Sequence, residues 1–219
     1  MQTPIPQDRP ALDPHPLSPY VAWAGGRNRD PILGMFQRHF RPHFRNVLEF
    51  ATGSGMHVNY FAPHFRNVSF QPSDRDDTVF DNIRRLRDEQ GNPNVLDPRR
   101  LDLTDAATWP QEEWHYDAIY CINIFQVAPI TIADGMMRCA SKLLTGEGFL
   151  SIYGPFKVDG AHTTETNKSF DEEVRSAGVA EWGLKDVADL RQAAAAHGMK
   201  LRDQIDMPAN NFLLLFGRA

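Results

Sequence analysis

Two glycines and three carboxylates stand in this sequence at positions that suit the binding of a nucleotide-like cofactor. Gly53 and Gly55 follow an apolar run and open a helical pattern, and a backbone without a Cβ lets a ligand approach closely. Glu49, Asp74 and Asp102 each stand at or near the end of a predicted strand. Because the ligand of an open α/β sheet lies beyond the carboxyl ends of the strands, we expect these three carboxylates to converge on one crevice.

Each of the three carboxylates matches one part of S-adenosyl-L-methionine (SAM). Glu49 can attract the ammonium of the methionine part, directly or through water. Asp74 lies nineteen residues beyond Gly55, where the ribose-binding acid of such a fold falls, and a carboxylate accepts from both ribose hydroxyls. Asp102 is placed to accept from the adenine amino group. We therefore predict SAM as the cofactor and S-adenosyl-L-homocysteine (SAH) as its product.

Two other nucleotide-binding loops can be compared with this one. In a dinucleotide-binding fold a third glycine packs the helix against the strand, whereas here the equivalent position is Val58. A P-loop needs a lysine followed by serine or threonine, and that pair is absent after Gly55. An NAD(P)-dependent oxidoreductase remains an alternative, and a P-loop is excluded.

The elements that must position these residues alternate along the chain. The predicted strands cover residues 47–50, 68–74, 101–103, 116–123 and 149–153, followed by an antiparallel pair over 201–206 and 211–217. The predicted helices cover residues 31–40, 58–65, 78–90, 131–144 and 185–197, the first begun by Asp30 as N-cap and by Pro31. A polar turn at 111–113 precedes the fourth strand, and 154–183 is predicted to be a long functional loop. This alternation predicts an α/β fold with a doubly wound, mostly parallel sheet.

Composition and charge bound the function classes. Six prolines in residues 1–19 predict an extended arm, and residues 20–219 are expected to form one domain. A net charge of −5 and a pI near 5.9 give no basic field for nucleic acid. No window approaches the roughly eighteen apolar residues of a membrane span, and no secretory leader is found, so we expect a cytoplasmic protein without a membrane partner.

Cysteine and histidine usage argues against metal binding. Cys121 falls in an apolar strand pattern and Cys139 in a helical one, so both are predicted to be reduced and buried. No cluster of His, Cys or Asp shows the spacing of metal ligands, and we expect no metal.

Seven phrases occur in order along the chain and carry a family resemblance. They are RNRDPIL at 27–33, LEFATGSGMH at 48–57, QPSD at 71–74, CIN at 121–123, YGP at 153–155, EWGLKD at 181–186 and MPANN at 207–211. With them the chain, from Trp23 to its C-terminus, resembles the uncharacterised SAM-dependent methyltransferase-like family that includes methyltransferase-like protein 26 and its bacterial relatives. The resemblance implies a class I methyltransferase fold, which is Rossmann-like, with an antiparallel last strand.

Two positions depart from the pattern of that family. The family usually has glutamate before the Arg-Asn pair, where this chain has Gly26, and histidine soon after the Cys-Ile-Asn phrase, where it has Gln126. These differences keep open the alternative that the chain is a catalytically inactive SAM-binding partner or sensor protein.

Together these residues predict a methyltransferase that modifies an O, N or S atom of a small molecule. Direct displacement needs the nucleophile in line with the methyl group and, for some acceptors, a proton acceptor. The residues expected to bind the cofactor are Arg27, Glu49, Thr52, Gly53, Gly55, His57, Asp74, Asp102, Leu103 and Asn123.

The acceptor pocket is expected to be walled by the N-terminal arm and by the segments that come after the fourth and fifth strands. Its candidate catalytic residues are His162, Tyr153 and Lys157. Its candidate substrate-binding residues are Tyr20, Trp23, Phe125, Gln126, Asn167, Trp182 and Asn210. Asn123 is not followed by the Pro-Pro-Tyr of enzymes that methylate exocyclic amines of bases, which speaks against base methylation. The sequence predicts no oligomeric state.

Overall fold

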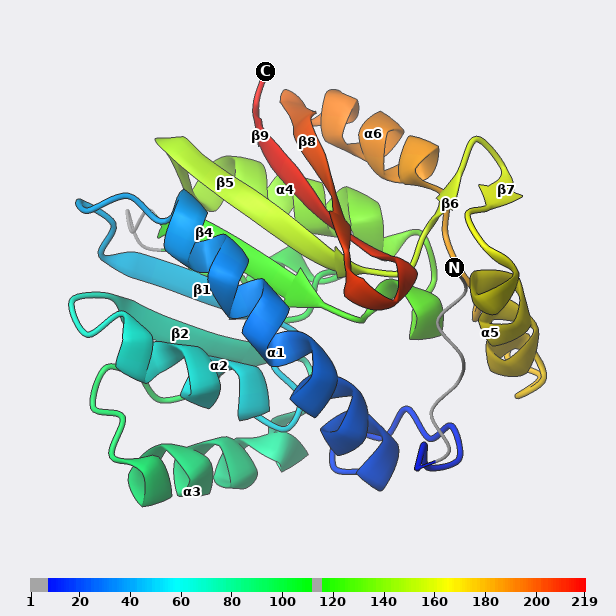
Figure 1. Ribbon diagram of the computed structural model, residues 1–219. Helices are drawn as coiled ribbons and strands as arrows, with labels where there is room; N and C mark the ends of the chain where they lie inside the picture. The colour runs from blue at the N-terminus through cyan, green and yellow to red at the C-terminus, as the bar shows by residue number, and fades with distance from the viewer. Residues whose placement is uncertain (1–7, 112–115) are drawn as a thin grey trace.

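The computed structural model describes residues 8–111 and 116–219, and within them seven strands form one sheet (Figure 1). The sheet order is β3-β2-β1-β4-β5-β9-β8. The strands are β1 (Asn46–Phe50), β2 (Ser69–Asp74), β3 (Arg99–Arg100), β4 (Tyr116–Ile122), β5 (Leu144–Gly154), β8 (Met199–Met207) and β9 (Asn211–Arg218). Strand β1 pairs in parallel with β2 and β4, and β9 pairs antiparallel with β5 and β8. The predicted doubly wound sheet with an antiparallel last strand is therefore confirmed.

Helices cover both faces of this sheet. Helices α1 (Pro19–His39), α2 (Met56–Phe61) and α3 (Phe80–Gln90) lie on one face, and α4 (Ile132–Leu143) and α6 (Val187–Ala196) lie on the other (Figure 1). Alternation along β1 divides the core between them, since Val47 packs in one cluster with Phe36 of α1, while Leu48 packs in another with Met136 of α4. The strand order reverses between β1 and β4, which is where a doubly wound sheet opens a crevice.

Helix α1 begins earlier than the sequence predicted. Ser18 is its N-cap and its side chain accepts from the Val21 N–H, so that Pro31 lies inside the helix rather than at its start. An internal proline removes one backbone hydrogen bond and costs roughly 3 kcal/mol. Burial of Ile32 and Phe36 against the sheet offsets that cost, and a local start signal at Asp30 was therefore misleading.

Two further predictions about elements were wrong. The third strand is Arg99–Arg100, and residues 101–103 come directly after it, although the Leu101 N–H still donates to the Asp74 carbonyl. The segment 154–183 is not an open loop, because it forms the hairpin of β6 (Lys157–Val158) and β7 (Ala161–His162) and then α5 (Glu165–Arg175). The predicted turn at 111–113 extends into residues outside the described part of the chain.

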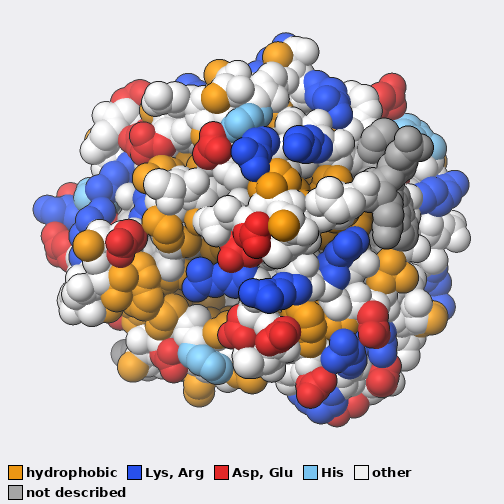
Figure 2. All heavy atoms as spheres, turned by 180° about the vertical axis from the view of Figure 1, so that it is seen from behind, with side chains coloured by type: hydrophobic (Ala, Val, Ile, Leu, Met, Phe, Trp, Pro, Cys, Tyr) orange, Lys and Arg blue, Asp and Glu red, His pale blue; other side chains and the backbone are white. Residues whose placement is uncertain are grey.

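The surface of the described residues carries both signs of charge. On the face in Figure 2, acidic and basic side chains are interspersed, and hydrophobic side chains gather in patches between them. None of the described helices is both long and apolar enough to cross a membrane. Within the same residues no group of three or more His, Cys, Asp or Glu side chains could hold a metal ion. Cys121 and Cys139 are buried and unpaired with each other, as predicted.

Candidate functional site

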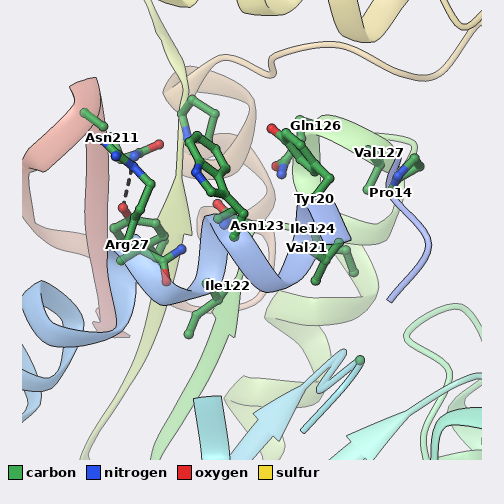
Figure 3. A pocket seen from close by; sticks show the side chains of 18 of the residues that line it. Pro14, Tyr20, Val21, Arg27, Ile122, Asn123, Ile124, Gln126, Val127 and Asn211 are labelled. Carbon is green, nitrogen blue, oxygen red and sulfur yellow. Dashed lines mark hydrogen bonds between the residues drawn. The ribbon is translucent and has the colours of Figure 1, made fainter. Parts of the chain in front are cut away.

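A cavity of about 790 Å³ opens at the carboxyl ends of β1, β2, β4 and β5, where the strand order reverses (Figure 3). Its wall is built from the segment before α1, from α1 itself, from the loop after β1, from the segment after β4, from α5 and from the β8–β9 turn. Ligand sites for one small molecule span roughly 300–1,000 Å³. The cavity is therefore large enough for a cofactor together with a small second molecule.

The glycine loop forms the edge of the cavity beside β2. Gly53 has φ +57° and its N–H donates to Asp74 Oδ2 at 2.9 Å. Thr52 joins the loop to β2 twice, because its N–H donates to the Ser73 carbonyl and its hydroxyl accepts from the Ser73 N–H, each at 2.9 Å. Gly55 has φ +80° and lies outside the cavity wall, where a Cβ would come within 2.9 Å of Ile83. Both glycines are thus required by the backbone, and Gly55 also by close packing.

Glu49 at the end of β1 is the side chain that most needs a ligand. It lines the cavity, is 2% exposed, and its Oε2 atom is buried with no hydrogen-bond partner among the described residues. Burial raises the pKa of Glu49 well above its ordinary value, although the nearby Thr52 and Tyr120 hydroxyls oppose that shift. An ammonium group would supply the missing donor and favour the carboxylate. The residue therefore fits the methionine end of SAM.

Asp74 at the end of β2 lies beside Glu49 in the cavity wall. Its Oδ2 accepts from Gly53 and its Oδ1 accepts from the Asp76 N–H at 3.1 Å, which fixes the carboxylate toward the cavity rim. Burial raises the pKa of Asp74. A carboxylate has about four acceptor positions, so two backbone donors leave room for the hydroxyls of a ribose.

His57, at the start of α2, is uncharged at neutral pH. Its Nε2 lies 2.7 Å from Asn28 Oδ1, and because an amide oxygen only accepts, Nε2 donates. Burial, together with the positive charge of Arg29, lowers the pKa of His57 to about 4. The imidazole thus joins α2 to α1 and presents a neutral ring to the cavity, which it lines.

The second half of the cavity lies beyond β4 and β5. Tyr153 accepts a hydrogen bond at 3.0 Å from Asn211 Nδ2, and burial raises the pKa of Tyr153 to about 12. Asn167 of α5 is 3% exposed, and its amide donates to the Asn210 carbonyl at 2.9 Å, which joins α5 to the β8–β9 turn. Asn123, directly after β4, has φ +55° and lines the cavity. The side chains named in this half are all uncharged at neutral pH.

The segment before α1 crosses the cavity. Arg9 donates to Glu173 of α5 at 2.8 Å, and its guanidinium lies 5.1 Å from the Tyr20 ring and 5.9 Å from the Phe170 ring. At the other end Pro16 lies against the glycine loop, 3.5 Å from where a Cβ of Gly53 would stand. The described part of the predicted arm therefore reaches from the glycine loop to α5 and forms one wall of the cavity, as the sequence predicted.

The structure brings together most of the residues selected from the sequence. Those that line the cavity are Tyr20, Trp23, Arg27, Glu49, Thr52, Gly53, His57, Asp74, Asn123, Gln126, Tyr153, Asn167 and Asn210. Arg27, labelled in Figure 3, is exposed at the mouth of the cavity. Its guanidinium lies 5.1 Å from the Trp23 ring.

Other selected residues lie away from the cavity. The Asp102 carboxylate does not converge with those of Glu49 and Asp74, because its Oδ1 accepts from the Thr104 N–H and hydroxyl. The neighbouring Leu103 is buried in the hydrophobic core. Phe125 is also core, with its ring 6.1 Å from that of Phe156. Trp182 lines a separate hollow of about 320 Å³.

His162 and Lys157 are held outside the cavity by Asp171 of α5. His162 Nε2 lies 2.8 Å and Lys157 Nζ 3.2 Å from Asp171 Oδ2, while Oδ1 accepts from Arg175 at 3.0 Å and from the Leu184 N–H at 2.7 Å. Burial would raise the pKa of Asp171, but these donors hold it at about 2. The cluster joins the β6–β7 hairpin to α5, and this placement does not support the expected catalytic roles of His162 and Lys157.

Several residues that line the cavity were not selected from the sequence. They are Arg9, Leu12, Pro14, Pro16, Asn28, Ala51, Met56, Phe170, Glu173 and Asn211. Asn28 and Asn211 belong to phrases that carry the family resemblance, so that signal existed. The contact of Arg9 with Glu173 joins residues 164 positions apart and left no local signal.

Comparison with known families gives one match over nearly the whole chain. A family model described as "Protein of unknown function (DUF938)" matches residues 20–218.

Solved methyltransferases share the fold. An O-methyltransferase family protein from Burkholderia thailandensis has a TM-score of 0.74 at 16% identity, and the match covers 91% of this chain and 59% of that one. An O-methyltransferase family 2 protein from Planctomyces limnophilus, in complex with apigenin, has a TM-score of 0.71 at 16% identity, covering 93% and 62%. The O-methyltransferase NcsB1 from neocarzinostatin biosynthesis, in complex with SAM and 2-hydroxy-5-methyl naphthoic acid, has a TM-score of 0.70 at 12% identity, covering 91% and 57%.

This chain spans less than two thirds of the length of these structures. At such identities the likeness concerns the fold, which is the class I SAM-dependent methyltransferase fold predicted from the sequence.

Proposed function

The chain belongs to the DUF938 family, and from the geometry of its cavity we propose that it transfers a methyl group from SAM to an O, N or S atom of a small molecule. The observation that carries the proposal is the buried Oε2 of Glu49, which has no partner among the described residues at the carboxyl end of β1. The ammonium of SAM is the donor that this position lacks. The relation to methyltransferase-like protein 26 stays a prediction.

The residues that would hold SAM are inferred from their places in the wall. Glu49 would bind the ammonium and Asp74 the ribose hydroxyls, while the loop at Gly53 would let the ligand approach the backbone. Arg27 at the mouth would pair with a carboxylate, either of the cofactor or of the acceptor. When bound, SAM supplies an electrophilic methyl group on a positively charged sulfur.

The protein's own part is to hold the acceptor in line and exclude water. Such positioning supplies most of the rate enhancement in a displacement that needs little covalent help. The arm closes one side of the cavity through Arg9 and Glu173, and Tyr20 and Trp23 of α1 face it from another. With His162 and Lys157 outside the wall, the roles of Tyr153 and of the polar residues after β4 become the ones to test.

The oxidoreductase alternative gains no support from the fold. The antiparallel β9 between β5 and β8 differs from the all-parallel order of dinucleotide-binding sheets, and Val58 is fully buried where the third glycine would stand. The inactive SAM-binding protein remains an outcome of the binding and turnover experiments.

Calorimetric titration with SAM and with SAH tests the cofactor. We expect both to bind, and we expect Asp74→Ala and Glu49→Gln each to weaken binding by roughly 10- to 150-fold, because each removes a hydrogen bond to a charged group worth about 1.5–3 kcal/mol. Gly53→Val should also weaken it, by filling the space at a backbone of φ +57°. Asp77→Ala is the matched control, since Asp77 is exposed and outside the cavity. Absence of binding of either compound would contradict the proposal.

Turnover separates an enzyme from a sensor. SAH formation should appear when SAM is supplied with suitable acceptors, and a protein that binds SAM tightly without ever forming SAH would be the sensor. Apigenin and 2-hydroxy-5-methyl naphthoic acid are present in complexes of two similar structures, so hydroxylated aromatic molecules are the first acceptors to try.

A further inference from the structure

Two side-chain amides meet at the carboxyl end of β4. Asn123 Oδ1 and Gln126 Oε1 lie 3.6 Å and 3.9 Å from the position that a Cβ of Gly154 would take, so both amides face the same point beside the end of β5. Both residues line the cavity, and Figure 3 shows them entering the same space as Tyr20 and Val21 of α1. Strand β5 is separated from β1 and its glycine loop by β4, so this point lies on the side of the cavity away from that loop.

Neither amide has a hydrogen-bond partner for its side chain within residues 8–111 and 116–219. Their backbones, in contrast, are fixed: the Asn123 N–H donates to the Tyr153 carbonyl at 2.9 Å, and the Gln126 carbonyl accepts from the Gly183 N–H at 2.9 Å. Asn123 is moreover held at φ +55°, in the left-handed region that asparagine tolerates better than most residues with a side chain. Two amides with free donors and acceptors, carried on fixed backbone, make a subsite for a polar group of a ligand.

No described group of the cavity wall is placed to take a proton at that point. The arm and α5 contribute Arg9 and Glu173, which pair with each other. From α1 come Tyr20, whose pKa burial raises, and the cation Arg27. Strand β5 contributes Tyr153, whose hydroxyl accepts from Asn211.

The remaining titratable groups of the wall belong to the cofactor half. They are Glu49 of β1, Asp74 of β2, which accepts from the Gly53 and Asp76 N–H groups, and His57 of α2, which is bound to Asn28. An amide is not a base at the pH of a cell. A reacting group seated on the amide pair must therefore lose its proton without the protein.

We propose that Asn123 and Gln126 form an uncharged subsite for the reacting group, and that the acceptors are planar phenols acidic enough to ionise in water. The proposal rests on the proposed methyl transfer and names its acceptor class. Aromatic and apolar walls from Tyr20, Trp23 and Ile124 suit a flat ring. The phenol gives its proton to water, the phenolate oxygen forms a bond to the methyl carbon, and the carbon–sulfur bond breaks with its electron pair left on sulfur.

The test uses the whole protein saturated with SAH and two probes, 4-nitrophenol and 4-methylphenol, which differ in acidity but little in shape. We expect both to shift the side-chain amide signals of Asn123 and Gln126 in ¹⁵N NMR spectra. We expect the ionisation midpoint of bound 4-nitrophenol, read from the absorbance of its phenolate, to equal its value in water. With SAM in place of SAH, the pH dependence of methylation should follow the acidity of each phenol.

Gln126→His supplies the contrast, because it places a group that ionises near neutrality beside the phenol. We expect the midpoint of bound 4-nitrophenol to fall by roughly one to three units in this variant, as for a group beside an opposite charge. Gln90→His, at an exposed position of α3, is the matched control and should leave the midpoint as in the wild type.

The outcomes separate this inference from the proposed function. Failure of SAH to bind would overturn both. Binding of SAH with no effect of either phenol on the two amides would overturn the subsite alone. A midpoint for 4-nitrophenol in the wild-type protein that differs from its value in water would show that a protein base or charge acts there, and would overturn the requirement for an acidic acceptor.

Discussion

Two adjacent glycines of α1 give opposite expectations for the same substitution. An alanine is favoured over glycine in a helix by about 1 kcal/mol. At Gly26 a Cβ would meet nothing within 4 Å, so Gly26→Ala should stabilise the protein by about 1 kcal/mol. At Gly25 the Cβ would stand 1.7 Å from Met56 Cε and 3.4 Å from the His57 ring, so Met56 must move. Such overpacking costs about 1–3 kcal/mol. Gly25→Ala should therefore be destabilising by about 0–2 kcal/mol.

Urea unfolding of the wild type and both variants measures these free energies, and SAH binding measures the consequence for the cavity. Met56 lines the cavity, so a Met56 side chain displaced by Gly25→Ala should lower SAH affinity, whereas Gly26→Ala should not. If Gly25→Ala stabilised the protein as much as Gly26→Ala does, the close approach of α1 to α2 would be refuted. A loss of stability in Gly26→Ala would refute the helical assignment at that position.

The cavity wall supports three further predictions. Ala51→Gly should raise the free energy of unfolding by about 0.5–1 kcal/mol, because Ala51 has φ +52°. His57 has a folded pKa of about 4, below its unfolded value of 6.5, so the unfolded state takes up the proton first and stability falls as pH drops from 6.5 toward 4. Wild-type protein should thus lose about 2 kcal/mol more than His57→Gln between roughly pH 7 and pH 4.5, measured by urea unfolding. Arg9→Ala should speed SAH dissociation roughly two- to fivefold in stopped-flow fluorescence, because a partly exposed ion pair contributes under about 1 kcal/mol.

Each of these has an outcome that counts against it. A destabilising Ala51→Gly would mean that the strain relieved at this position is smaller than the conformational entropy that glycine loses on folding. Parallel pH profiles for wild type and His57→Gln would mean that the imidazole is not buried uncharged. An unchanged SAH dissociation rate in Arg9→Ala, with Arg9→Lys as the variant that keeps the charge, would mean that the arm does not close the cavity.

The parts of the structure that could be predicted from the sequence are those encoded locally. The strand before Gly53, the acidic ends at Glu49 and Asp74 and the glycine stop after α3 at Gly91 each depend on a few adjacent residues, and the structure has them as predicted. Once strands and helices alternate, the position of the crevice follows from the sheet itself. The cofactor half of the cavity was therefore accessible to sequence reasoning.

The parts that could not be predicted depend on packing between distant segments. Asp102 stands in sequence like Asp74, but its carboxylate turns back to Thr104, and only the local backbone path decides between the two. By residue type, His162 is the best proton acceptor near neutrality among the candidates of its segment, yet Asp171, nine residues later, holds it outside the cavity. Residue type alone cannot show which partner a side chain will meet.

Backbone strain marks the cavity independently of any family resemblance. Among the described residues, five that are not glycine have positive φ, namely Ala51, Asn123, Asp159, Ala209 and Asn210, and all except Asp159 line the cavity. They belong to three separate connections, after β1, after β4 and between β8 and β9, so no common turn type explains them. Strain of this kind costs roughly 1–3 kcal/mol at an alanine and less at an asparagine, and it persists where the surrounding structure enforces it. Because it gathers where a ligand would lie, relief of strain in Ala51→Gly should raise stability while lowering SAH affinity, and a gain in both would show that the strain does not preorganise the site.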